Sequence, residues 1–285
     1  MANPTRAGER MHEDRYWCLT ACGAPVVLVV VRYQGEPRWT HLLRWDYERD
    51  ALTPGAWTKM HVKVHRCTLS RDGRFLCYLA EGRRDGPFDP YYGGAWAISR
   101  APWLAALTHP EQWPGGGGES RDALGERAQA ALWKRVPPPD HGAPDWVDML
   151  GPGWSLVEGE RFEAEQAVGD GGWTARARHV DSGAFIFSPF EGRLSYAVAN
   201  ERTGETLEGV DAAFIADQIR WAQPLPGGRL ATIDRTGRLE LRRFADGGGP
   251  ATTIARHELA GRTPEPTRSP DWARAPLARG ELRHA

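Results

Sequence analysis

Two histidines are the most direct candidates for a metal site. His61 and His65 are four residues apart, a spacing that would place both imidazoles on one face of a helix. The surrounding segment Met60–His65 alternates between apolar and polar residues, however, and a period of two predicts a strand. On a strand, four residues span about 13 Å, too far for one metal at about 2.0–2.1 Å from each nitrogen. We therefore expect no metal here and interpret the pair as a polar strand face.

Two groups of carboxylates could supply a general acid and a general base. Paired carboxylates cleave glycosides when they lie roughly 5–10 Å apart across a cleft. Both groups adjoin turn-forming residues, Leu52–Gly55 and Gly159, so solvated turns are the favoured interpretation. The groups are Asp46, Glu48 and Asp50, and Glu158, Glu160, Glu163 and Glu165.

Phosphate binding and nucleophilic catalysis both lack a complete motif. The run Gly115–Gly118 has the backbone freedom of a phosphate loop, but no Gly-Lys-Ser/Thr ending follows it, which favours a linker. The sequence has no Gly-x-Ser-x-Gly elbow, and neither Ser70 nor Ser188 has a context that suggests activation by a histidine. The catalytic residues are therefore unknown at this stage, and we expect no cofactor.

An aromatic loop is the strongest candidate for a binding surface. The segment Gly86–Gly93 carries two tyrosines and a phenylalanine between glycines and prolines. Exposed aromatic side chains on a rigid scaffold are typical of binding hot spots. The alternative is that these rings pack over the end of a sheet. The candidate binding residues are Phe88, Asp89, Tyr91 and Tyr92.

Composition narrows the class of protein that must position these residues. The chain has 285 residues, of which 41% are hydrophobic and 26% charged, enough for a folded core. Its formal net charge of −1 provides no field for nucleic acid. The apolar run Ala24–Val31 is far shorter than the roughly 20 residues that span a bilayer, and the N-terminus lacks a secretory pattern. We expect a cytoplasmic protein without a membrane segment.

The four cysteines support the same expectation. They have no Cys-x-x-Cys spacing that would indicate zinc or redox chemistry. Reduced thiols are expected, with a Cys18–Cys22 or a Cys67–Cys77 bridge as the alternative.

The periodic signals predict strands almost throughout. The runs Val26–Val31, Trp39–Asp46, Met60–His65 and Phe75–Leu79 predict one meander of four strands. The turn before the last of them, Gly73-Arg74-Phe75, is echoed by Gly-Arg-Leu at residues 192, 228 and 237. The 36-residue step between two of these echoes approaches the period of a propeller blade. The exception is a predicted helix near Arg121–Arg135, which Pro137–Pro139 would end.

The segment Cys67–Leu79 resembles the strand-turn unit of TolB-like and WD-repeat β-propellers. The segment Gly94–Trp103 and the closing Pro270-Asp271-Trp272-Ala273 resemble a group of uncharacterised bacterial propeller-like proteins. The resemblance implies an all-β, propeller-like fold of five or six blades with one helical insertion. It implies no catalytic residues.

The same patterns predict the domain organisation and the function. We expect an N-terminal segment at residues 1–23, one propeller-like domain at 24–262 with an insertion at about 114–145, and a loosely held tail at 263–285. The predicted function is a cytoplasmic scaffold that binds a protein partner of unknown identity through loops on one face, without binding nucleic acid or membrane. The alternative is a hydrolase, or a small-ligand sensor, with carboxylates from several blades in a central channel.

Overall fold

Sixteen strands make up almost all the regular structure of the described residues. The computed structural model describes residues 14–35, 37–62, 64, 67–81, 95–107, 153–158, 163–180, 193–203, 207, 219–245, 251–278 and 281–284. The predicted helix near Arg121–Arg135 and the insertion at about 114–145 lie outside these residues. None of the described helices is long and apolar enough to cross a membrane.

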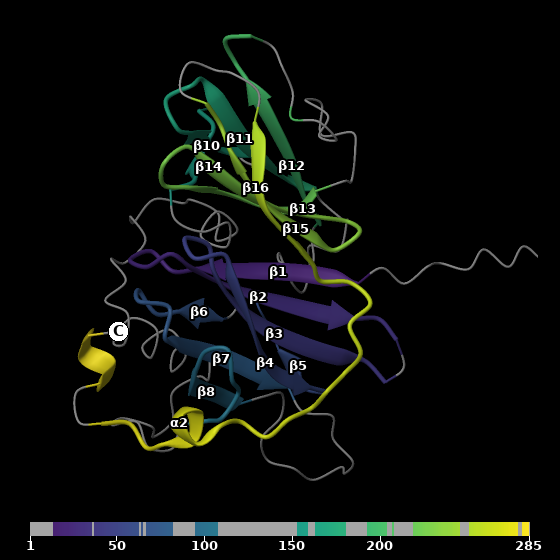
Figure 1. Cartoon of the computed structure of the whole chain (residues 1–285), viewed down its shortest axis with the longest axis vertical. Coiled ribbons are helices and arrows are strands. Elements are labelled where there is room, and N and C mark those ends of the chain that lie inside the picture. The colour runs from purple at the N-terminus through teal and green to yellow at the C-terminus, as the bar shows by residue number, and fades with distance from the viewer. Residues whose placement is uncertain are drawn as a thin grey trace, which may run out of the picture.

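The strands form four antiparallel sheets, which we name A to D in chain order (Figure 1). Sheet A contains β1 (Arg15–Thr20), β2 (Val26–Tyr33), β3 (Trp39–Asp46) and β4 (Ala51–Thr58). Sheet B contains β5 (His61–Val62), β6 (Thr68–Leu69), β7 (Phe75–Glu81) and β8 (Ala95–Arg100). Sheet C contains β9 (Ser155–Leu156), β10 (Glu163–Val168), β11 (Trp173–Val180) and β12 (Arg193–Asn200). Sheet D contains β13 (Ile219–Leu225), β14 (Arg229–Asp234), β15 (Arg238–Arg243) and β16 (Thr252–Glu258). A short helix α2 (Asp271–Arg274) and a 3₁₀ turn η3 (Glu281–His284) follow.

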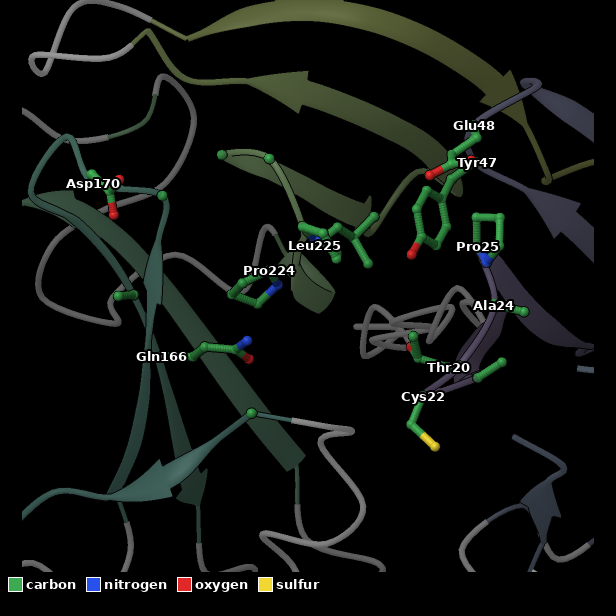
Figure 2. Close-up of a pocket in the computed structure, with 18 residues that line it drawn as sticks. Thr20, Cys22, Ala24, Pro25, Tyr47, Glu48, Gln166, Asp170, Pro224 and Leu225 are labelled. Atoms are coloured by element: carbon green, nitrogen blue, oxygen red, sulfur yellow. The ribbon is translucent and has the colours of Figure 1, made fainter. Parts of the chain in front are cut away.

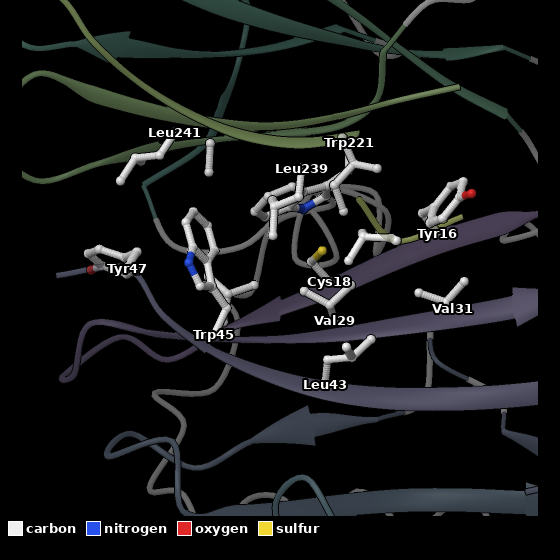
Figure 3. Close-up of a cluster of buried hydrophobic side chains, with 14 of the residues drawn as sticks. Tyr16, Cys18, Val29, Val31, Leu43, Trp45, Tyr47, Trp221, Leu239 and Leu241 are labelled. Carbon is white, nitrogen blue, oxygen red and sulfur yellow. The ribbon is translucent and has the colours of Figure 1, made fainter. Parts of the chain in front are cut away.

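The sheets stack in the order B, A, D, C. In β2, Val27, Val29 and Val31 face sheet D, where they join a buried cluster with residues of β13 to β16 (Figure 3). The alternating residues of β2 face sheet B. Sheet C packs on sheet D through a third cluster. The last sheet of the chain therefore packs against the first, as expected for a propeller-like fold, and β2 lies against the C-terminal strands β13 to β16.

The prediction of four strands in one meander needs correction. The second and third strands of sheet A match the predicted Val26–Val31 and Trp39–Asp46, but the sheet is completed by β1 and β4. The predicted strand Met60–His65 is reduced to His61–Val62, and Phe75–Leu79 belongs to sheet B. Pro54 and Gly55 concealed β4, which tolerates a proline because it is an edge strand with a register shift opposite His41 and Leu43.

Two of the repeated Gly-Arg turns, at Gly73 and Gly237, have the same backbone geometry. Gly73 has φ +70 and Gly237 has φ +80, and each N–H bonds to the carbonyl three residues earlier. The side chain of that earlier residue, Ser70 or Asp234, then accepts a hydrogen bond from the backbone at the start of the next strand. Any Cβ at Gly73 would meet Val26, and one at Gly237 would meet Tyr16, so both turns press against sheet A. The repeat therefore marks contacts between blades.

The C-terminal tail is anchored, contrary to the expectation of a loosely held segment. The Tyr33 hydroxyl donates a hydrogen bond of 2.8 Å to the carbonyl of Leu259, where the chain leaves sheet D. Further along, the tail reaches sheet B, where Arg100 binds both backbone and side-chain oxygens of the tail. The partners are up to 181 residues apart in sequence, which is why local composition did not reveal them.

All four cysteines are free thiols. Cys18, Cys67 and Cys77 are buried, whereas Cys22 is exposed. Burial raises the pKa of the Cys77 thiol to about 12, so this side chain behaves as a small core residue.

His41 lies inside the interface between sheets A and D. Its ring stacks on Trp57 with centroids 3.9 Å apart, and only 2% of the residue is exposed. Neither ring nitrogen has a hydrogen-bond partner among the described residues. Burial, with a smaller contribution from the charge of Arg262, lowers the pKa of His41 from 6.5 to about 4.

We expect His41 to make the fold sensitive to mild acid. The unfolded chain binds a proton at this histidine more readily than the folded protein does. The stability that the neutral, buried His41 contributes is therefore complete above pH 6.5 and is lost as the pH falls toward 4. Between pH 7.5 and 5, urea unfolding should show a loss of about 2 kcal/mol from this residue. His41→Phe keeps an aromatic ring without a titrating group, so its stability should fall less over the same range. Equal losses in both proteins would contradict this assignment.

Candidate functional site

One end of the stacked sheets carries a cavity of about 720 Å³ (Figure 2). It is lined by the turns that follow β1, β3, β10 and β13, which come from sheets A, C and D. The lining residues are Thr20, Ala21, Cys22, Gly23, Ala24, Pro25, Tyr47, Glu48, Gly153, Gln166, Ala167, Gly169, Asp170, Pro224, Leu225, Pro226, Gly227 and Gly228. We call this the turn cavity. Its volume falls within the range of about 300–1,000 Å³ that is usual for ligand sites.

Glycine and proline provide much of the lining. Gly169, Gly227 and Gly228 have positive φ values of +64, +76 and +62, which residues other than glycine rarely adopt. A Cβ at Gly169 would lie 2.8 Å from the Cα of Gly228, so the turns of sheets C and D approach at backbone distance. Such turns leave peptide N–H and C=O groups unshielded by side chains, and these groups can hydrogen-bond a ligand.

A buried glutamine holds one wall of the turn cavity. Gln223 is fully buried in β13, and its Nε2 donates to Gln166 Oε1 at 3.2 Å and to the carbonyl of Pro224 at 3.0 Å. Its Oε1 accepts a hydrogen bond of 3.3 Å from Trp154 Nε1. Because Gln166 and Trp154 belong to the sheet C region, this network joins sheets C and D directly behind the cavity.

The opposite wall combines an aromatic ring with a carboxylate. The guanidinium of Arg229 lies 5.2 Å from the centre of the Tyr47 ring and 3.9 Å from Glu48 Oε1, and its Nε donates to the carbonyl of Pro226. Burial raises the pKa of Tyr47, which Arg229 opposes and the neighbouring carboxylates reinforce. The protein thus already holds one guanidinium between a ring face and a carboxylate here.

The lining residues carry two carboxylates, of which Glu48 lies 3.9 Å from the guanidinium of Arg229. Glu48 and Asp170 are the ionisable acids among the residues that line the cavity, and no Lys, Arg or His is found among them. Both acids are exposed. Cys22 and Thr20 add a thiol and a hydroxyl. Hydrogen bonding to an ammonium or a guanidinium is the chemistry that this set supports.

The first predicted carboxylate group divides between two roles. Glu48 and Asp50 lie in the exposed β3–β4 turn, as expected, but Asp46 is only 6% exposed. Its Oδ1 accepts hydrogen bonds from the backbone N–H groups of Glu48 and Arg49, so it fixes the turn rather than facing solvent. Asp50 bonds to His257 Nε2 at 2.6 Å and to Trp45 Nε1 at 3.3 Å.

The second predicted carboxylate group lies partly on a strand. Glu163 and Glu165 belong to β10, where they pair with Arg178 and Arg176 of β11, and only Glu158 lies in an exposed turn. The turn interpretation was therefore wrong for Glu163 and Glu165, because cross-strand arginines satisfy them. Glu160 lies outside the described residues.

The predicted binding residues Phe88, Asp89, Tyr91 and Tyr92 also lie outside the described residues, so their role stays a prediction. The ends of their loop are nevertheless placed. The β6–β7 turn contacts the β1–β2 turn through Gly23 N and the Arg71 carbonyl, at 2.9 Å. Since β7 runs away from that turn to Glu81, the flanking residues Glu81 and Ala95 lie at the end of sheet B opposite the turn cavity.

The structure does not test the predicted histidine pair. His61 begins the two-residue strand β5, and His65 lies outside the described residues. Within the described part of the chain, no three His, Cys, Asp or Glu side chains gather as metal ligands would.

The comparisons with known proteins leave the function open. No family model matches the chain, and no curated protein matches its sequence. Among solved structures, it is similar to the periplasmic gluconolactonase of Pseudomonas aeruginosa, with 14% identity, 85% of each chain covered and a TM-score of 0.27. A likeness at this TM-score carries no argument about function. The four antiparallel sheets support the resemblance to TolB-like and WD-repeat proteins only as a propeller-like, all-β architecture.

The contact between Gly169 and Gly228 predicts a sharp mutational effect. Gly169→Ala adds the cost of positive φ, about 1–2 kcal/mol, to a clash with the backbone of Gly228. Gly261→Ala is a matched control, since Gly261 has φ +66 and nothing within 4 Å of an added Cβ. Chemical denaturation should show that Gly169→Ala loses about 3 kcal/mol and Gly261→Ala about 1. Similar losses would mean that the two turns can separate freely.

Proposed function

We propose that this protein is a cytoplasmic scaffold that binds a segment of a partner protein in the turn cavity. The observation that carries the proposal is the cavity itself, which joins turns of three sheets on a rigid framework. Strands and the Gln223 network fix the positions of its walls, so little conformational entropy is lost when a ligand binds.

The lining supports a peptide more directly than a hydrolytic substrate. Its glycine and proline turns present backbone groups, which pair with the backbone of an extended segment. Its two carboxylates would bind a basic side chain of that segment. Within the protein itself, Tyr47 and Glu48 already contact the guanidinium of Arg229 in this way. The alternative hydrolase would use the two carboxylates from different sheets, Glu48 and Asp170.

Short synthetic peptides test the charge preference. Blocked hexapeptides with a central arginine, citrulline or glutamate differ mainly in charge, and binding can be measured by titration calorimetry. The arginine peptide should bind at least about tenfold more tightly than the glutamate peptide, equivalent to about 1.4 kcal/mol. Glu48→Gln combined with Asp170→Asn should abolish the difference without loss of stability, because both side chains are exposed. A preference that survives the double substitution would exclude the turn cavity as its source.

Cys22 provides an independent test of location. A photoreactive group on this exposed thiol would lie on the cavity wall, whereas Ile254→Cys in a Cys22→Ser background places the same group on exposed β16. The arginine peptide should cross-link to the first protein and not to the second. Equal cross-linking at both positions would refute the proposed site.

A separate activity assay tests the alternative hydrolase. Breakdown of ester or lactone substrates that is lost in the Glu48→Gln, Asp170→Asn protein would support the hydrolase instead of the scaffold.

A further inference from the structure

Sheet B has an apolar face that no other sheet covers among the described residues. Side chains alternate along β7, so Leu76 and Tyr78 pack toward sheet A, and Phe75 and Cys77 point the other way. Phe75, Cys77 and Ile98 are at most 1% exposed. We call these three residues the outer face of sheet B.

Part of the cover comes from the C-terminal tail. Leu277 and Leu282 pack on the outer face, together with Leu107. In Figure 1 the yellow chain leaves sheet D, passes sheet A and brings α2 beside β8. Residues 270–278 and 281–284, which we call the latch, are thus an internal ligand for a sheet that lies far from β16 in the stack.

Arg100 is the main polar anchor of the latch. It follows Ile98 on the same side of β8 and pairs in register with Phe75. Its Nη1 donates to the carbonyls of Trp272 and Ala275 at 3.2 and 2.6 Å, and its Nη2 donates to Glu281 Oε2 at 2.9 Å. The side chains of Arg100 and Glu281 are only 13% and 19% exposed, so this pair is better shielded than an ordinary surface ion pair.

The latch buries little of itself. Among the latch residues whose exposure is described, Ala273 is buried, and Leu277 and Leu282 are half-buried. Trp272 is 55% exposed. Segments with few buried apolar contacts open at a lower free energy than the core beneath them. The outer face of sheet B is therefore far better buried than the segment that covers it.

We propose that the outer face of sheet B is a peptide-docking surface, and that the latch is its releasable intramolecular occupant. The segment it accepts carries two apolar side chains like Leu277 and Leu282, and a carboxylate that reaches Arg100 as Glu281 does. The latch opens as a unit and leaves the rest of the fold intact. This inference concerns a different sheet from the turn cavity and does not depend on the proposed function.

The four thiols report latch opening without any added probe site. Cys77 belongs to the outer face, Cys18 and Cys67 are buried in other clusters, and Cys22 is exposed. Glu281→Gln should weaken the latch and raise the labelling rate of Cys77 by about tenfold, as measured by mass spectrometry of the full chain. The rates at Cys18 and Cys67 should not change. A parallel rise at all three buried thiols would indicate global unfolding and overturn the proposal.

Two further arms complete the test. Glu258→Gln makes the same substitution in a more exposed arginine pair on sheet D, where Glu258 lies 3.3 Å from Arg238, and should leave Cys77 protected. A synthetic peptide of residues 268–285, added to the Glu281→Gln protein, should restore protection of Cys77, and the same peptide with Leu277→Ser and Leu282→Ser should not. Unchanged labelling in Glu281→Gln, or failure of the intact peptide to protect, would refute a docking surface that the latch occupies.

Discussion

Burial of β2 on both faces is the constraint on which the other packing depends. A strand that is buried on one side alternates apolar and polar residues, whereas Val26–Val31 is apolar throughout and at most 2% exposed. Its odd-numbered valines pack against sheet D and its even-numbered residues against sheet B. One strand from the start of the chain therefore connects the second sheet with the last.

This arrangement also explains where the two proposed sites lie. Because sheets A and D are packed face to face, and sheet C is joined to D through Gln223, their turns gather at one end and line the turn cavity. Sheet B has sheet A on one face only, so its outer face needs another cover, which the C-terminal segment supplies. The cavity and the latch are thus separate consequences of the same stacking order.

The sequence predicted the parts of the fold that depend on local patterns. Val26–Val31 and Trp39–Asp46 are strands, and the Gly-Arg turns at Gly73 and Gly237 share a glycine with positive φ. Local patterns failed at β4, where Pro54 is tolerated only because the strand is at an edge. The turn cavity was missed because turns far apart in sequence form it, largely through glycine and proline, and no motif records that proximity. Arg100 and its tail partners were missed for the same reason.

The central claim is that β2 unites sheets B, A and D into one cooperative structure, and native-state hydrogen exchange tests it most directly. The backbone amides of β2 should exchange only through global unfolding, with the same free energy as the slowest amides of β7 and β14. Amides of the latch should exchange at a much lower free energy. If β7 or β14 exchanged through an opening that left β2 protected, or if β2 exchanged before either of them, the sheets would be independent units and the account would be contradicted.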